Sequence, residues 1–326
     1  MQIKTPKFWY NASLFSYFLL PIAMFYYFSS VMRKIFTKEI RIAKRTIIIG
    51  NLTVGGGGKT PATLALAKLL TAKKHKICVL SRGYLGREKG PYWVKKDDNA
   101  DNVGDEAMLI AKEYPCLVSE NKRAATKFLD DFAADMVLLD DGYQNPTFIK
   151  DYTILIVDNH FAFGNNLIFP AGPLRMPVKQ GVGEADMVII IKKNKEEKIH
   201  PQLSDILVVT KKKCFSAYPI IKKVSQKQKY LAFCGLAINE KFFISLANAG
   251  YDVAKKIDYY YYYKYAESDI VELIRLAKEN NLRLITTAKD AVKIPDSYLT
   301  QIEILHYKLK ISEEEELLND IITKIF

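Results

Sequence analysis

One short segment constrains the fold of this chain more than any other. Residues 47–49 are three consecutive isoleucines, which predicts a buried β-strand. A turn with consecutive glycines at residues 55–58 follows, and it ends in Gly58-Lys59-Thr60. Residues 61–70 then have the pattern of a helix with proline in its first turn. Strand, glycine loop, Lys-Thr and helix in this order are typical of a P-loop, which binds nucleotide phosphates.

The predicted phosphate-binding loop comprises Thr53, Val54, Gly55, Gly56, Gly57, Gly58, Lys59 and Thr60. Glycines allow backbone N–H groups to turn toward phosphate oxygens, and the helix N-terminus adds positive potential. Lys59 is expected to reach the β- and γ-phosphates, and the Thr60 hydroxyl is expected to bind Mg²⁺. The usual pattern has glycine at the position of Thr53, so a simple flexible turn remains the alternative.

Composition limits the class of protein and suggests the kind of partner. The chain has 326 residues, of which 49% are hydrophobic and 26% charged, as expected for a globular protein with room for two domains. Its formal net charge of +12 favours an anionic partner over a merely basic soluble surface. The cysteines (Cys78, Cys116, Cys214 and Cys234) form no CxxC pair, so a disulfide framework or a zinc site is not expected.

The N-terminal segment has an unusual distribution of charge. No charged residue occurs between Phe8 and Met32, whereas lysine and arginine lie on both sides. A membrane-spanning helix needs about 20 such residues, but Pro21 and several serines interrupt this one. We predict that residues 1–38 comprise a membrane anchor, spanning or interfacial, and a basic linker, with the body on the cytoplasmic side. A kinked helix buried in the core is the alternative.

Downstream of the loop, apolar runs alternate with helical patterns. This alternation predicts an α/β fold, a doubly wound and mostly parallel sheet of P-loop type. Expected strands lie at residues 76–81, 116–118, 135–139, 152–157 and 187–191. We predict a P-loop domain at residues 39–212, a connector at residues 213–228 and a smaller C-terminal α/β domain at residues 229–326.

Four further residues are candidates for catalytic chemistry. Asp140 and Asp141 end an apolar run, the Walker B pattern in which a strand-end aspartate holds Mg²⁺, although a plain Asp-Gly turn also fits. Asp105 is either a helix N-cap or the general base that takes a proton from an attacking hydroxyl. Arg175 follows a loop pinned by proline and glycine, which suits a guanidinium aimed at a γ-phosphate.

Six motifs, in the same order, resemble those of the tetraacyldisaccharide 4'-kinase family of lipid A biosynthesis. They are Gly50-Asn51-Leu52-Thr53-Val54-Gly55-Gly56, Gly58-Lys59-Thr60-Pro61, Ser81-Arg82-Gly83-Tyr84, Val103-Gly104-Asp105-Glu106, Asp140-Asp141-Gly142-Tyr143-Gln144 and Pro170-Ala171-Gly172-Pro173-Leu174-Arg175. The resemblance continues through residues 233–237 to residues 286–290, and so covers nearly the whole chain.

The resemblance implies an enzyme that uses ATP and Mg²⁺ to phosphorylate the 4'-hydroxyl of a tetraacyldisaccharide 1-phosphate at the inner membrane. No nucleic acid or protein partner is expected. By motif match, Lys59 and Thr60 take the phosphate and Mg²⁺ roles, and Asp105 is the general base. Asp140 and Asp141 take the metal and water positions, and Arg175 contacts phosphate.

Several positions depart from the family pattern. Gly57, Asn145 and Ala288 replace residues that are usually threonine, histidine and glutamate. The family pairs its catalytic aspartate with a histidine, where this chain has Asp258 and the tyrosines of residues 259–263. We therefore expect Asp105 to act without histidine, with a pKa below that of a desolvated carboxyl group. The alternative function is a membrane-bound nucleotide-binding scaffold with weak or lost kinase activity.

Overall fold

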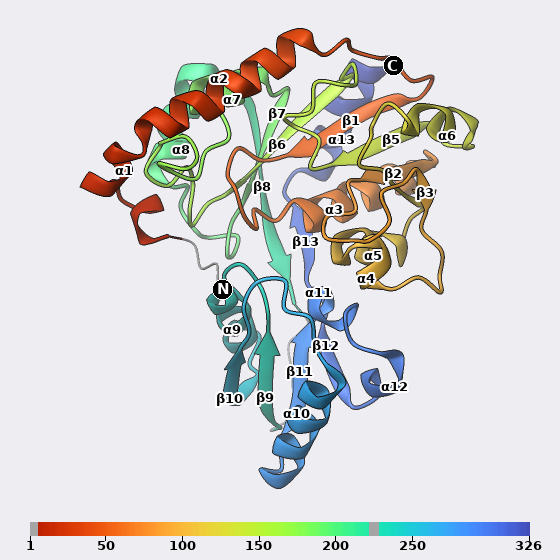
Figure 1. Ribbon diagram of the computed structural model, residues 1–326, viewed down its shortest axis with the longest axis vertical. Coiled ribbons are helices and arrows are strands. Elements are labelled where there is room, and N and C mark those ends of the chain that lie inside the picture. The colour runs from red at the N-terminus through yellow and green to blue at the C-terminus, as the bar shows by residue number, and fades with distance from the viewer. Residues whose placement is uncertain (1–5, 222–227) are drawn as a thin grey trace.

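Two β-sheets organise the computed structural model, which describes residues 6–221 and 228–326 (Figure 1). The larger sheet has nine strands in the order β13-β8-β7-β6-β1-β5-β2-β4-β3. Its inner strands all run parallel: β8 (Lys213–Ile220), β7 (Met187–Ile191), β6 (Tyr152–Asp158), β1 (Arg45–Gly50), β5 (Met136–Asp140), β2 (Ile77–Ser81) and β4 (Cys116–Val118). The edge strands β13 (Lys308–Ile311) and β3 (Tyr92–Trp93) are antiparallel to their neighbours.

Helices cover both faces of the larger sheet and complete what we call the large lobe. One face packs against α3 (Lys59–Ala72), α4 (Ala100–Val103), α5 (Asp105–Ala111) and α13 (Glu314–Ile325). The other face packs against α6 (Ala125–Asp131), α7 (Val178–Glu184) and α8 (Pro201–Thr210). Successive strand residues point to opposite faces, so Ile47 and Ile49 join the first core and Ile48 the second. The predicted α/β fold with a mostly parallel sheet is confirmed.

A second sheet forms the small lobe, which lies below the large lobe in Figure 1. Its strands are all parallel, in the order β10 (Asp252–Asp258), β9 (Lys229–Cys234), β11 (Arg283–Thr287) and β12 (Ile302–Leu305). The main helices are α9 (Asn239–Asn248) and α10 (Glu267–Glu279), which pack on opposite faces through separate cores. The short helices α11 (Ala288–Ala291) and α12 (Asp296–Leu299) follow β11.

The predicted boundaries at residues 213–228 and 229–326 need correction. Residues 213–220 form strand β8 of the larger sheet and not a connector. The chain also returns from the small lobe, because β13 pairs with β8 and α13 buries Leu317 and Ile321 in the first core. The lysine-rich composition around β8 indicated a connector in the sequence. In the structure, the backbone groups of β8 form hydrogen bonds with the edge of β7 that would otherwise have no partner strand. The end of the chain therefore belongs to the large lobe.

The N-terminal segment lies along the outside of the large lobe (Figure 1). It consists of η1 (Lys7–Trp9), α1 (Leu14–Phe18) and α2 (Leu20–Phe36). Of residues 6–36, Trp9, Ser16 and Ala23 are buried, so the alternative of a helix within the core is wrong. Over the described ranges, no helix combines the length and the apolar character that crossing a membrane requires.

The return of α13 to the large lobe can be tested by its effect on stability. Ile321 is fully buried in the core that also contains α3. We expect Ile321→Ala to lower the free energy of unfolding by about 2–5 kcal/mol, because it leaves a cavity. Ile322, on the same helix but only half-buried, is the matched control. Equal losses for the two alanine variants in urea denaturation would contradict this packing.

Candidate active site

The predicted phosphate-binding loop lies at the carboxyl edge of the larger sheet, between β1 and α3. Gly58 is the N-cap of α3 and has a φ of 74°, a conformation that favours glycine. A Cβ atom at Gly58 would also lie 2.4 Å from Ile191 Cδ1. The local sequence thus permits the sharp turn that begins α3 at Lys59. The register pairs Ile49 with Asp140, so β5 ends directly beside the loop.

The loop is held in place by the segment that carries Arg175. Val54 N donates to the Pro173 carbonyl oxygen at 2.8 Å, and Arg175 N donates to the Leu52 carbonyl oxygen at 2.7 Å. Thr53 forms a β-bridge with Leu174. These backbone contacts bring Arg175 to the loop from a point far along the chain.

The glycines of the loop are restricted either by their backbone conformation or by close neighbours. Gly55 has a φ of 109°, again favouring glycine. A Cβ atom at Gly56 would lie 3.3 Å from Ala237 Cβ, which shows that the small lobe approaches the loop. A Cβ atom at Gly57 would lie 2.4 Å from Asn51 Nδ2. The Asn51 side chain therefore occupies the space that a larger residue at position 57 would need.

Asp140 lies at the end of β5 and accepts two hydroxyl groups from α3. Thr60 Oγ1 lies 3.1 Å from its Oδ2 atom, and Thr63 Oγ1 lies 2.9 Å from its Oδ1 atom. Burial, with a smaller effect from the negative charge of Glu106, raises the pKa of Asp140 to about 6. The site therefore favours a positive charge beside Asp140. Within the described ranges, no group of three or more His, Cys, Asp or Glu side chains is placed so that it could hold a metal ion.

Asp141 lies between two cationic side chains. Its Oδ1 atom is 3.1 Å from Arg175 Nη1 and 3.6 Å from Lys59 Nζ. Burial opposes ionisation of Asp141, but the charges of Lys59 and Arg175 prevail and lower its pKa. Two adjacent carboxyl groups thus have pKa values moved in opposite directions. Asp141 also has a φ of 57°, which is uncommon for a residue other than glycine.

Asn51 and Gln144 link these residues, and the sequence analysis did not select either as a site residue. Gln144 Oε1 accepts from Arg175 Nη1 at 3.1 Å, and Gln144 Nε2 donates to the Asn51 carbonyl oxygen at 2.7 Å. Asn51 Oδ1 accepts from Lys59 Nζ at 3.3 Å. Both residues lie inside motifs that the resemblance had marked, and that position was the available signal.

Asp105 begins α5 and is buried, with 6% of its surface exposed. Gly104, and not Asp105, is the N-cap of this helix, so the N-cap alternative is wrong. Burial raises the pKa of Asp105, and the nearby Glu106 adds to the rise. The expectation that Asp105 would avoid the pKa of a desolvated carboxyl group is therefore wrong. Its Oδ2 atom accepts no hydrogen bond from the residues that the structure describes.

Two charged residues beside Asp105 were missed by the sequence analysis. Lys289 Nζ, from α11 of the small lobe, lies 2.8 Å from Glu106 Oε1 and 3.7 Å from Asp105 Oδ2. Burial opposes ionisation of Glu106, but Lys289 outweighs it and lowers the pKa of Glu106. Glu106 follows Asp105 in a marked motif, and Lys289 lies in residues 286–290, where the resemblance ends.

The tyrosine run places only some of its side chains near Asp105. The amine of Lys289 lies 5.2 Å from the ring centre of Tyr261 and 4.9 Å from that of Tyr262. The two hydroxyl groups are hydrogen-bonded to each other at 2.9 Å. The Tyr263 hydroxyl donates instead to Asp269 within the small lobe, at 2.8 Å. Tyr261 and Tyr262 therefore lie beside Lys289, whereas Tyr263 is held within the small lobe.

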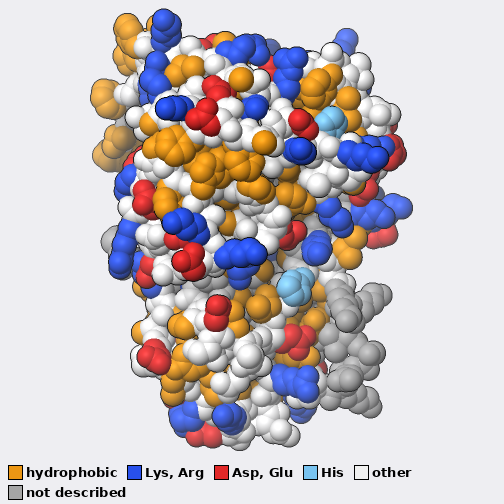
Figure 2. Space-filling view, turned by 90° about the vertical axis from the view of Figure 1, so that its right-hand side faces the viewer, with side chains coloured by type: hydrophobic (Ala, Val, Ile, Leu, Met, Phe, Trp, Pro, Cys, Tyr) orange, Lys and Arg blue, Asp and Glu red, His pale blue; other side chains and the backbone are white. Residues whose placement is uncertain are grey.

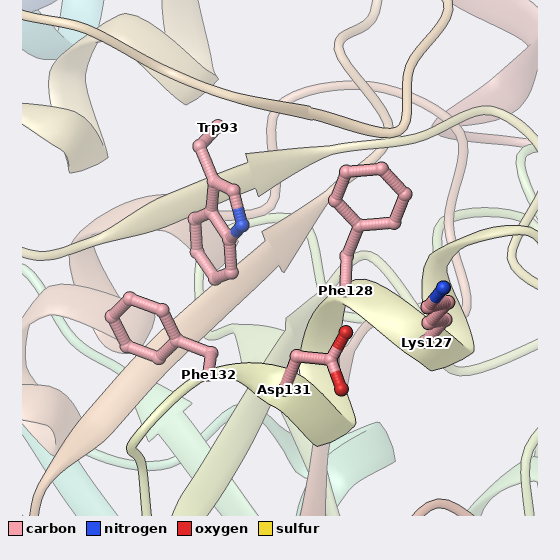
Figure 3. Close-up of a pocket in the computed structure, with 5 residues that line it drawn as sticks. All are labelled: Trp93, Lys127, Phe128, Asp131 and Phe132. Carbon is pink, nitrogen blue, oxygen red and sulfur yellow. The ribbon is translucent and has the colours of Figure 1, made fainter.

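A groove of about 260 Å³ lies elsewhere, between β3 and α6 (Figure 3). Its lining residues are Trp93, Lys127, Phe128, Asp131 and Phe132. Within the described ranges, it contains none of the predicted site residues. Figure 2 views the side of the molecule that is on the right in Figure 1, and there Lys and Arg side chains are spread over both lobes among Asp and Glu. On this face the high net charge is distributed and does not mark a single patch.

Comparison with known proteins identifies what the chain is similar to. The model of the family described as LpxK, tetraacyldisaccharide-1-P 4'-kinase, matches residues 15–326. A tetraacyldisaccharide 4'-kinase from Rickettsia akari (strain Hartford) is 32% identical over 325 residues, which covers 99% of this chain and 98% of the relative. The corresponding Rickettsia felis protein has the same identity and coverage. The solved structure of LpxK from Aquifex aeolicus in complex with ATP matches with a TM-score of 0.77 at 26% identity, covering 96% of this chain and 100% of that one.

The position of Lys59 predicts a severe effect of its removal. Lys59 belongs to the loop, and its amine pairs with Asp141. Its loss therefore removes positive charge from the predicted phosphate site. We expect Lys59→Ala to abolish phosphoryl transfer in a steady-state assay. Lys68→Ala, an exposed lysine on the same helix, is the control and should retain full activity. More than about a tenth of the original rate, equivalent to roughly 1.4 kcal/mol of barrier, would contradict the assignment of this loop.

Proposed function

The chain belongs to the tetraacyldisaccharide-1-P 4'-kinase family, and we infer that it transfers the γ-phosphoryl group of ATP to the 4'-hydroxyl of a lipid A disaccharide precursor. It is thus a lipid kinase, and a scaffold without activity is not favoured. One observation carries the chemical part of this inference. Lys59, Thr60, Asp140 and Arg175 lie at the ends of the parallel strands β1 and β5 or in the connections that follow β1 and β6, and the buried Asp105 begins α5 in the connection between the parallel strands β2 and β4.

We propose that the loop of residues 53–60 binds the triphosphate of ATP. The N-terminus of α3 and the amine of Lys59 supply positive charge on one side, and Arg175 supplies it on the other. Because Asp141 contacts both cations, it holds them at a fixed separation before phosphate binds. Preorganised charge of this kind accounts for much of the catalysis of phosphoryl transfer.

Thr60 and Asp140 are the proposed Mg²⁺ ligands. Mg²⁺ in kinases usually takes only one or two protein oxygens, with phosphate oxygens and water completing the octahedron. The Thr60 hydroxyl and the Asp140 carboxylate lie 3.1 Å apart, and burial and the charge of Glu106 raise the pKa of Asp140 although Lys59 opposes the rise, so a further cation would stabilise its charge. These residues therefore fit the ion. Bound Mg²⁺ would neutralise charge that develops on the β- and γ-phosphate oxygens.

Asp105 is the proposed general base. The acceptor hydroxyl oxygen forms a bond to the γ-phosphorus while the bond from that phosphorus to the bridging oxygen of ADP breaks. The hydroxyl proton passes to the Asp105 carboxylate, whose Oδ2 atom accepts no hydrogen bond within the described part of the chain. Its raised pKa makes Asp105 a stronger base than an exposed aspartate, provided that it is ionised at the working pH.

We also propose that α1 and α2 bind the cytoplasmic surface of the inner membrane. Leu14, Phe18 and Phe25 are 89%, 78% and 73% exposed, an unusual arrangement for aromatic and aliphatic side chains. The opposite side of α2 contacts the large lobe, where the Tyr27 hydroxyl donates to Gln180 and Lys34 pairs with Glu184. Such a segment would lie on the membrane, where an acylated substrate and cytoplasmic ATP are both accessible.

Transfer of label tests the function and the base together. We expect purified protein to move ³²P from γ-labelled ATP to the tetraacyldisaccharide 1-phosphate. The Asp105→Asn variant should bind ATP normally, but its kcat should be lower by a factor of about 10²–10⁴, because its amide cannot accept the proton. Asp101→Asn, an exposed neighbour on α4, is the matched control. ATP binding without lipid labelling by the original chain would support the scaffold, and an active Asp105→Asn variant would remove Asp105 as the base.

Membrane binding calls for surface substitutions and not a deletion. Trp9 Nε1 donates to the Pro170 carbonyl oxygen at 3.1 Å, so removal of the segment would disturb the loop that leads to Arg175. We expect the double variant Phe18→Ser, Phe25→Ser to have a vesicle-binding constant at least about tenfold lower, measured by sedimentation with anionic phospholipid vesicles. The reason is that burial of one such side chain contributes roughly 1.5–3 kcal/mol. ATP affinity should not change, and Val271→Ser on α10 is the exposed control. Undiminished sedimentation would mean that α1 and α2 do not bind the membrane.

A further inference from the structure

The proposed base has a positively charged neighbour, Lys289, in the small lobe. Lys289 Nζ lies 3.7 Å from Asp105 Oδ2, the oxygen atom that accepts no hydrogen bond from the described residues. Lys289 is itself mostly buried, with 19% of its side chain exposed. A lysine and an aspartate at this distance interact more strongly when they are largely shielded from solvent than a pair on the surface does.

Several groups hold Lys289 in this position. Glu106 accepts from its amine at 2.8 Å, and the rings of Tyr261 and Tyr262 lie 5.2 and 4.9 Å away, within cation–π range. Burial alone would lower the pKa of Lys289, but the negative charges of Glu106 and Asp105 raise it. The amine therefore remains protonated beside Asp105 over the range in which enzymes work.

We propose that Lys289 is a positioning residue of the reaction, a cation from the small lobe that keeps the Asp105 carboxylate ionised and oriented toward the acceptor hydroxyl. This inference rests on the proposed role of Asp105 as the general base. Lys289 would supply the fixed charge partner that a catalytic carboxylate needs, in a chain that has no histidine at the motif positions. Its amine would act through Asp105 and would not itself touch the reacting atoms.

The electrostatic surroundings support this role. Burial raises the pKa of Asp105 and Glu106 raises it further, whereas Lys289 is the largest opposing influence and Lys293 a smaller one. A carboxylate must be ionised to accept a proton. Without the positive charge of Lys289, burial and Glu106 would act with little opposition, and more of Asp105 would be protonated at neutral pH.

The lobes contribute opposite members of this cluster. Asp105 and Glu106 belong to α5 of the large lobe, and Lys289 belongs to α11 of the small lobe. Among the residues that the structure describes, two other ion pairs join the lobes, and in both the small lobe supplies the lysine: Lys264 with Asp101 and Lys241 with Asp158. The Lys264–Asp101 pair is exposed on both sides, so it provides a comparison in which a contact between the lobes is lost without a change beside Asp105.

The pH dependence of kcat separates positioning from simple attachment of the lobes. We expect Lys289→Met to move the acid limb of the kcat profile upward by about one to three pH units, because loss of a nearby cation raises the pKa of the base. At pH 6.5 kcat should fall at least about tenfold, with recovery near pH 9 and little change in KM for ATP. Lys289→Arg should restore most of kcat at pH 6.5, since it keeps the charge.

Lys264→Met is the matched control and should leave the acid limb in place. An equal loss of kcat at every pH in Lys289→Met would overturn the inference and show that Lys289 only attaches the lobes. A large rise in KM for ATP or lipid with an unmoved acid limb would also overturn it and make Lys289 a substrate ligand. An active Asp105→Asn variant would instead refute the proposed base, which distinguishes the two failures. Circular dichroism spectra matching those of the original chain confirm that each variant is folded.

Discussion

The parallel pairing of β1 with β5 is the constraint on which the rest of the site depends. It aligns Ile49 with Asp140, so a glycine loop and an acidic strand end meet at one edge of the sheet. The hydroxyl groups of Thr60 and Thr63, both on α3, then donate hydrogen bonds to Asp140 at the end of β5. Both strands are buried on both faces, so a shift of register would place apolar side chains wrongly throughout the core.

Charge is divided unequally among the carboxyl groups at this edge. Asp141 has two cations and a lowered pKa, whereas Asp140 has hydroxyl donors and a raised one. Neighbouring carboxyl groups with pKa values moved apart can take different chemical roles. Here the difference supports the proposal that Asp141 orders Lys59 and Arg175 and that Asp140 receives a metal ion.

Elements outside the central sheet complete the site. The segment that carries Arg175 is joined to the loop by backbone hydrogen bonds, and its Pro170 carbonyl oxygen accepts a hydrogen bond from Trp9. The small lobe brings Lys289 to Asp105, and its Ala237 closely approaches Gly56. The N-terminal helices and the small lobe are therefore structurally connected to the proposed active site, although neither contains the proposed phosphate-binding loop.

By itself the sequence determined the features that neighbouring residues encode. The loop from Thr53 to Thr60, the strand ending in Asp140 and the alternation of strands and helices each depend on a few consecutive positions. Tertiary structure decided the rest, because those features require contacts between distant segments. The burial of Asp105 and its partner Lys289 depend on the docking of the two lobes, and Lys289 is 183 residues from Glu106 in the chain. Likewise, β8 and α13 could be assigned to the large lobe only once the open edge and uncovered face of its sheet were known.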